Sequence, residues 1–277
     1  MTYCLGVKVE EGLLAIADTR ITTGTETTSA KKISVHHTGN SRLFLMTSGL
    51  RSIRDKAVTY FDELLASPQW EFRKMYQAVN AFGEQLRRVK SEDKSSLMES
   101  GLIFNLFSIV GGQLEDDDEH KLFLLYPEGN WIEIGQATPF TIIGNSGYGK
   151  PILNRTINYH STLLFALKTG LLSFDSTRVS ANDVGYPIDV VILRKDFGEM
   201  IQQRFEQDQV ERVSDFWESE LRQVISRIPE NWIHELIDIN PNAHNQQNII
   251  NPPQQQYQYQ QQSQNQSFPP YDPSYRQ

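Results

Sequence analysis

Strand patterns and helix patterns occur in separate groups along this chain instead of alternating one by one. Strands come first, two helices follow, and the order of strands and paired helices then repeats before a last strand and helix. A doubly wound α/β fold alternates strands with helices, so the grouped order favours stacked antiparallel sheets between helical layers, which is an α+β fold. The expected strands cover residues 3–17 (as a hairpin), 33–37, 42–46, 102–110, 121–126, 131–134, 140–143 and 188–193, and the expected helices cover 53–65, 72–86, 151–157, 160–174 and 205–228.

The first segment has the pattern of a β-hairpin. Apolar residues alternate from Tyr3 to Val9, the sequence Glu10-Glu11-Gly12 supplies a turn, and residues 13–17 are apolar throughout. A continuous apolar run of this length is typical of a strand that is buried on both faces.

The charge distribution excludes a nucleic-acid-binding function. The 277-residue chain has a formal net charge of −8, and its Lys and Arg residues are scattered. A nucleic-acid-binding domain would instead show a clustered basic face. The acidic run at residues 115–119 is expected to be the solvated tip of a hairpin loop.

The sequence also indicates where the protein resides. Cys4 is the only cysteine, so the chain cannot form an intramolecular disulfide, which fits a reducing compartment. No apolar run approaches the roughly 20 residues of a membrane helix. Glu10 and Glu11 interrupt the N-terminal segment early, unlike the apolar core of a signal peptide. We therefore expect a cytoplasmic protein without a membrane partner.

The composition changes abruptly at about Pro241. Between residues 254 and 266, nine of the thirteen residues are Gln, and Pro- and Tyr-containing sequence follows. Such a segment cannot bury enough apolar surface to offset the entropy lost on ordering. We therefore predict one folded domain at residues 1–240 and a disordered Gln/Pro/Tyr-rich tail at residues 241–277.

Thr2 is the first residue with distinctive chemistry. Initiator methionine is normally removed before a residue this small, which would leave a free α-amine and a hydroxyl on the same residue. A neutral α-amine, with a pKa of about 7.7–8.0, can accept the proton of its own hydroxyl, so one residue supplies both nucleophile and base. A Met-Thr start alone carries little weight, because many proteins begin this way.

The spacing of two other charged positions strengthens this interpretation. Asp18 follows the second apolar strand, and a hairpin would return that strand's end to the neighbourhood of Thr2. Lys31 and Lys32 open the next strand. A lysine here would lower the pKa of the Thr2 hydroxyl, and Asp18 would keep that lysine charged and oriented. Taken singly, Asp18 reads as a turn residue and the lysines as a solvated pair; together, a catalytic cluster is the better explanation.

These residues resemble a known family. The start of the chain is similar to proteasome β-subunits and their bacterial relatives, and two later segments are similar to the bacterial branch called Anbu, the ancestral β-subunit. The resemblance covers about residues 2 to 235. The matching features are Thr2, the Glu-Gly turn, Ala17-Asp18-Thr19-Arg20, Gly24, Lys31-Lys32-Ile33, IGNSGYGKPIL at residues 143–153, Asp175-Ser176-Thr177 and Gly185-Tyr186-Pro187-Ile188-Asp189.

The resemblance implies a fold and a set of catalytic residues. The fold would be the four-layer αββα sandwich of the N-terminal-nucleophile hydrolases, in agreement with the element order. Thr2 would be the nucleophile and its amine the base, with Lys32 as the cation that lowers the hydroxyl pKa and Asp18 as its partner. Arg20 would be a structural neighbour. Lys31 remains an alternative to Lys32, which is preferred because it directly precedes the apolar strand residue Ile33.

The resemblance also implies supporting residues. Residues 46–49 are similar to the family's oxyanion loop, in which a backbone N–H stabilises developing negative charge, and Ser48 or Gly49 would be the donor. Ser146 and Asp175 match polar positions that orient the α-amine.

A nucleotide site and a metal site are the main competing interpretations. Residues 144–150 fit the phosphate-loop pattern G-x-x-x-x-G-K, but Pro151 stands where Ser or Thr would bind Mg²⁺ and removes a backbone N–H from the loop. The six histidines form no metal-binding pattern. We expect neither a cofactor nor a metal.

The sequence therefore predicts a proteasome-like threonine endopeptidase that hydrolyses peptide bonds inside a self-compartmentalised homo-oligomer. The resemblance implies a ring or open spiral, with peptides or unfolded proteins as substrates and an unfoldase or adaptor as a candidate partner. The alternative is a largely non-proteolytic assembly or binding protein on the same fold, or an amidase for a specialised substrate.

Overall fold

The computed structural model describes residues 2–23, 25–67, 72–195 and 200–230. The chain divides into two compact units, Met1–Arg222 and Gln223–Gln277, and all the elements below belong to the first except the end of the last helix. Met1, Gly24, the predicted domain boundary at residues 240/241 and the Gln-rich tail lie outside the described residues. Among the described helices, none is both long and apolar enough to cross a membrane.

The first sheet is built around the predicted N-terminal hairpin. Strands β1 (Tyr3–Val9) and β2 (Gly12–Asp18) pair antiparallel, and every residue of both is buried. This confirms the predicted burial of residues 13–17 on both faces. The strand order is β10-β1-β2-β11-β12, and all neighbours are antiparallel. The remaining strands are β10 (Phe140–Gly144), β11 (Ile188–Arg194) and β12 (Met200–Phe205).

The second sheet is also antiparallel, with the order β5-β6-β7-β8-β9. Its strands are β5 (Ile33–Thr38), β6 (Ser41–Gly49), β7 (Leu106–Gln113), β8 (Lys121–Leu125) and β9 (Trp131–Glu133). The predicted strand at residues 102–105 is wrong, because this segment joins no sheet and Ile103 is 80% exposed.

A separate two-stranded ribbon follows Asp18. It consists of β3 (Arg20–Thr23) and β4 (Glu26–Ser29), which pair only with each other. The sequence analysis did not predict it, because the residues of β4 are polar and exposed and so carry no apolar alternation.

Five helices complete the described structure: α1 (Arg51–Ala66), α2 (Met75–Glu99), α3 (Lys150–Thr156), α4 (Leu163–Ser180) and α5 (Gln207–Ser226). Helix α2 extends well beyond its predicted end at residue 86. Polar contacts to α1 hold this extension, since Lys56 Nζ lies 2.8 Å from Asp93 Oδ1 and the Tyr60 hydroxyl donates to Glu92 at 2.9 Å. An apolar pattern cannot reveal such contacts.

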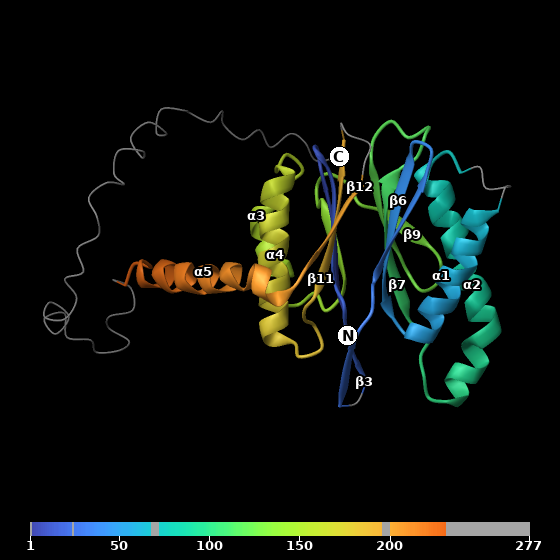
Figure 1. Cartoon of the computed structure of the whole chain (residues 1–277), viewed down its shortest axis with the longest axis horizontal. Coiled ribbons are helices and arrows are strands. Elements are labelled where there is room, and N and C mark those ends of the chain that lie inside the picture. Colours follow the sequence, from blue (N-terminus) through green and yellow to red (C-terminus); the bar gives the residue numbers. More distant parts are fainter. Residues whose placement is uncertain (1, 24, 68–71, 196–199, 231–277) are drawn as a thin grey trace, which may run out of the picture. The chain divides into compact units, whose positions relative to one another are not determined.

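Three apolar clusters hold these elements together, because burying apolar surface is the main favourable term in folding. Helices α1 and α2 pack against the second sheet, helices α3 and α4 pack against the first, and the third cluster lies between the two sheets (Figure 1). The prediction of an α+β fold with antiparallel sheets is confirmed. Representative residues of the three clusters are Phe61, Phe82 and Phe123; Leu5, Ile16 and Phe174; and Phe44, Met46 and Leu122.

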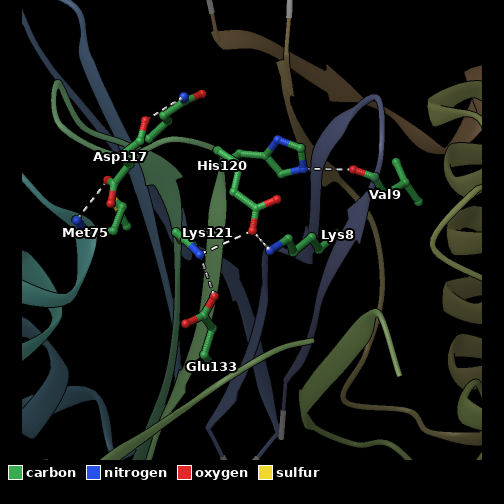
Figure 2. A network of polar contacts seen from close by, with 9 residues as sticks. Lys8, Val9, Met75, Asp117, His120, Lys121 and Glu133 are labelled. Carbon is green, nitrogen blue, oxygen red and sulfur yellow. Dashed lines mark hydrogen bonds and ion pairs between the residues drawn. The ribbon is translucent and has the colours of Figure 1, made fainter. Parts of the chain in front are cut away.

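A polar network links the two sheets at the end of β1 that is farther from Thr2 (Figure 2). Lys8 is only 3% exposed, and its Nζ lies 3.0 Å from Glu119 Oε1, just before β8. Lys121 contacts Glu119 at 3.2 Å and Glu133 at 3.1 Å. The His120 Nε2 lies 2.8 Å from the carbonyl oxygen of Val9. These contacts join β1 to β8 by charge as well as by packing.

The acidic run at residues 115–119 lies in the hairpin loop between β7 and β8, as predicted, but it is not simply a solvated tip. Asp116 pairs with Arg73 at 2.6 Å. Asp117 accepts a hydrogen bond from the backbone N–H of Met75 at 2.9 Å (Figure 2). It also accepts one from the N–H of Leu114 at 2.9 Å. Asp117 thus fixes the start of α2, where a carboxylate is favoured by the helix dipole. The run therefore joins β7 to β8 and also ties this loop to the start of α2.

Candidate functional site

Thr2 lies directly before β1 and lines a pocket of about 770 Å³. Its carbonyl oxygen accepts a hydrogen bond from the N–H of Asn145 at 2.7 Å. Gly144 makes this approach possible: its φ is 87°, and a Cβ at this position would lie 1.9 Å from the Thr2 oxygen. Only glycine adopts this conformation without a steric cost, so the end of β10 fixes the position of Thr2.

Asp18 and Lys32 form a buried ion pair next to Thr2. The Lys32 Nζ lies 2.7 Å from Asp18 Oδ1 and donates a second hydrogen bond to the carbonyl oxygen of Arg20, also at 2.7 Å. The N–H of Tyr3 donates to Asp18 Oδ1 at 2.8 Å. Asp18 is 0% exposed and Lys32 is 7% exposed, and Lys32 lines the same pocket as Thr2.

The hairpin register explains why Asp18 reaches this place. Because Cys4 pairs with Ala17, Asp18 falls beside Tyr3, the residue after Thr2. Burial raises the pKa of the Asp18 carboxyl, while the charge of Lys32 and hydrogen bonds from Lys32, Tyr3 and Gly185 oppose the rise. Lys32 and Tyr3 both donate to Oδ1, whereas Oδ2 is buried and accepts no hydrogen bond of normal geometry from the described residues.

The two adjacent lysines have different surroundings. The Nζ of Lys31 is exposed and lies 3.3 Å from Gln202 Oε1. Of the two lysines, only Lys32 has a described contact with Asp18. The geometry therefore separates the two lysines that the sequence left as alternatives.

Arg20 lies at the edge of the same pocket, as expected for a neighbour of the site. Its Nη1 donates to the carbonyl oxygen of Asn182 at 3.0 Å. A Cβ on Gly185 would lie 2.3 Å from the Arg20 guanidinium carbon, so the guanidinium packs closely on this loop. Arg20 thereby holds the loop that also approaches Asp18.

Ser48 and Gly49 end β6 and line the pocket opposite the start of β1. Gly49 has a φ of 148°, and a Cβ there would lie 2.1 Å from the carbonyl oxygen of Asn105. The conformation allows the chain to turn directly from β6 into α1. Both predicted donor residues therefore lie at the cavity that contains Thr2.

Ser146 and Asp175 are not brought into this pocket. Asp175 lies on α4, where its carboxylate accepts hydrogen bonds from Arg178 at 2.7 Å and from Ser214 at 3.0 Å. The carbonyl oxygen of Ser146 accepts from the N–H of Lys150 at 3.2 Å, at the start of α3. Their role in orienting the α-amine stays a prediction.

The pocket has basic residues that the sequence analysis did not select. Arg51 and Arg54 line it, and none of the described lining residues carries a carboxylate. Their place one helical turn apart, directly after Ser48 and Gly49, is the signal that would have found them. Within the described part of the chain, no group of three or more His, Cys, Asp or Glu residues is arranged to hold a metal ion.

Solved structures with this fold include several proteins named Anbu. The chain is 33% identical to the Anbu (Gly-1) mutant from Hyphomicrobium sp. strain MC1, with a TM-score of 0.77 over 83% of this chain and 99% of that one. It is 28% identical to Anbu (ancestral β-subunit) from Yersinia bercovieri, with a TM-score of 0.76 over 82% of this chain and 97% of that one. The chain is 26% identical to the protein in the helical assembly of the Anbu complex from Pseudomonas aeruginosa, with a TM-score of 0.78 over 87% of this chain and 99% of that one. No protein-family model and no curated protein matches the sequence.

Proposed function

This chain belongs to the Anbu family, whose members are relatives of proteasome β-subunits, and we propose that it is a threonine-type endopeptidase with Thr2 as the N-terminal nucleophile. The proposal includes the fold: α1 and α2, the two sheets, and α3 and α4 would form the four-layer αββα sandwich of the N-terminal-nucleophile hydrolases. The peptidase domain would cover residues 1–240 of a cytoplasmic protein, with residues 241–277 as a disordered tail.

The buried contact between Lys32 and Asp18 is the observation that carries this proposal. Taking two charges out of water costs several kcal/mol per ion, and their mutual attraction does not reliably offset this cost. A pair of apolar residues would therefore suit a purely structural role at least as well. A charged pair beside a residue with a hydroxyl, at the wall of an open pocket, is typical of a catalytic site.

Thr2 would be activated by its own amine and by the lysine. Removal of Met1 exposes the α-amine, which takes the proton of Oγ as that oxygen attacks a substrate carbonyl carbon. The ammonium of Lys32 favours the developing negative charge on Oγ, and Asp18 together with the Arg20 carbonyl oxygen holds the ammonium in place.

The later steps would use the backbone and the same amine. The N–H of Ser48 or Gly49 stabilises the oxyanion, and the protonated amine of Thr2 gives its proton to the leaving nitrogen as the C–N bond breaks. Water then attacks the ester on Thr2, with the amine again acting as base, and releases the acid product. Ser146 and Asp175 would support the amine from a distance.

We also propose that the protein functions as a homo-oligomer. The support is the relative from Pseudomonas aeruginosa, whose structure is a helical assembly. A ring or spiral with its pockets facing inward would restrict access to peptides and unfolded chains, and an unfoldase or adaptor would deliver the latter. An assembly protein without peptidase activity, or an amidase for one specialised substrate, remains the alternative function.

Hydrolysis by the full-length protein tests the proposal. The substrates are an unfolded fluorescein-labelled protein and a library of short peptides that end in a fluorogenic amide. Wild-type protein should release fluorescence, and Thr2→Ala should lose at least about 10³-fold in kcat, because nucleophile and general base act as a unit. Activity that survives Thr2→Ala, or its absence with every substrate after Met1 removal, would favour the assembly function.

A further inference from the structure

The wall of the Thr2 pocket is basic, although the whole chain carries a net charge of −8. Cationic side chains come from three different segments, and no described lining residue is acidic. The charge of Lys32 is balanced by Asp18, and the other cationic side chains line the open pocket. The cationic lining residues are Arg20, Lys31, Lys32, Arg51 and Arg54.

Two of these cations lie where a helix favours the opposite charge. Arg51 and Arg54 occupy the first turn of α1, which has no acidic residue and whose N-cap, Leu50, makes no side-chain hydrogen bond. The N-terminus of a helix carries partial positive charge and exposes backbone N–H groups, so it favours anions and is weakened by cations. The guanidiniums and the helix end therefore add to one positive region at the pocket.

Asp55 orients the two arginines from outside the pocket. Its Oδ2 lies 3.3 Å from Arg51 Nε, and its Oδ1 lies 2.7 Å from Arg54 Nη1. One carboxylate thus serves two guanidiniums, and it is not part of the pocket lining. The pair retains net positive charge toward the cavity.

Arg54 is held in place and keeps an unused donor. Its Nη2 donates to the carbonyl oxygen of Lys31 at 2.6 Å, which ties α1 to the segment that carries Lys32. Its Nε is buried and has no hydrogen-bond partner among the residues that the structure describes. Arg54 is thereby fixed at the pocket wall, where it adds positive charge beside Arg51.

We propose that the pocket binds a carboxylate side chain, so that the preferred substrates carry Glu or Asp at the residue whose carbonyl Thr2 attacks. This inference rests on the proposed peptidase function. Because α1 begins at Arg51, two residues after Gly49, a substrate residue whose carbonyl oxygen faces Gly49 would have its side chain beside Arg51 and Arg54. The Arg51 side chain is 62% exposed and can bind a carboxylate with charge-assisted hydrogen bonds, and Arg54 adds positive charge beside it.

Binding to a full-length Thr2→Ala protein tests the proposal without any need for turnover. The probes are dye-labelled, C-terminally amidated peptides that differ only by one internal Glu or Gln, and the dissociation constants come from fluorescence anisotropy. We expect the Glu peptide to bind at least about tenfold more tightly, and the preference to shrink as salt rises. Adding Arg51→Gln should remove most of the preference.

Arg88→Gln is the matched control. Arg88 is an exposed helical arginine with an acidic partner four residues on, as is Arg51, but it lies outside the pocket. The preference for Glu should be unchanged in this variant. A third peptide, with internal Gln and a free C-terminus, separates a side-chain carboxylate from a terminal one.

Each outcome of these binding measurements either supports or overturns the proposed carboxylate site. Four results would overturn the proposal. The Glu and Gln peptides bind equally, neither of them binds, only the peptide with a free C-terminus binds more tightly, or the preference for Glu survives Arg51→Gln. With Thr2 present, kcat/KM should favour Glu over Gln by a similar factor. A clear binding preference without any hydrolysis would refute the peptidase function and leave the carboxylate site standing.

Discussion

The Asp18 oxygen that receives the Lys32 ammonium at 2.7 Å also accepts the backbone N–H of Tyr3 at 2.8 Å. One carboxylate oxygen therefore connects the lysine to the residue that directly follows Thr2. The β1–β2 hairpin thus places Asp18 beside Thr2, and Asp18 in turn holds Lys32, which lies in the segment just before β5. Asp18 itself stands on a strand of the first sheet, where a site residue is held more precisely than on a loop.

Replacing Lys32 should damage the site far more than replacing its neighbour. Lys32→Met leaves the buried Asp18 without its cation, and breaking a buried pair by removing one partner costs about 3–5 kcal/mol. Lys31→Met removes an exposed side chain that contacts Gln202 and should cost less than about 0.5 kcal/mol. Urea unfolding of both variants measures the difference, and equal losses would contradict the assignment of Lys32 to the Asp18 pair.

Gly144→Ala should misplace Thr2. The new Cβ would lie 1.9 Å from the Thr2 oxygen at a φ of 87°, so the end of β10 and Thr2 must move apart. Since a displacement of about 1 Å at a reacting group can cost about 10²-fold in rate, we expect hydrolysis to fall by at least that factor.

Gly147→Ala is the control for this change. Gly147 lies in the same turn, but a Cβ there would meet nothing within 4 Å. Its kcat/KM and melting temperature should stay near the wild-type values. If both alanine variants behave alike, Gly144 does not position Thr2.

Acid should destabilise the protein through His120. Burial lowers the pKa of this imidazole below its ordinary 6.5, and a protonated Nδ1 would have no acceptor among the described residues. The unfolded chain therefore binds the proton first as pH falls. The stability contributed by the neutral ring is fully present above about pH 6.5 and is lost as pH falls toward the lowered folded value.

Urea unfolding between about pH 7.5 and pH 5.5 measures this effect, which is limited to about 1.4 kcal/mol per pH unit for one proton. His120→Asn keeps a donor for the Val9 carbonyl oxygen but cannot titrate, so its slope in this window should be flatter. Parallel slopes for wild type and His120→Asn would refute this assignment.

The site elements that the sequence predicted depend on strong local patterns. The hairpin at residues 3–17 has alternating apolar residues, an evident turn and a continuous apolar run, and these fix the register that brings Asp18 to Tyr3. The two helical stripes that cover the second sheet were equally clear. The element order therefore sufficed for the α+β class and the antiparallel sheets.

The missed features depend on contacts between distant segments. The ribbon β3–β4 is polar, the second half of α2 is held by side-chain pairs with α1, and Asp117 binds the start of α2. Nothing in the local pattern distinguishes such residues from solvated ones. The contact that holds Arg54 is of this kind too, because its partner is the carbonyl oxygen of Lys31, 23 positions earlier in the chain.

The mass of the intact protein before and after reaction with a peptide epoxyketone tests the central claim most directly. Such a reagent forms a ring with a hydroxyl and an α-amine of the same residue, so it reports both halves of the proposed mechanism at once. We predict a protein that lacks only Met1 and that gains one equivalent of reagent, located on Thr2 by fragmentation, with no adduct on Thr2→Ala. Retention of Met1, or its removal with no adduct on Thr2, would contradict the N-terminal threonine mechanism.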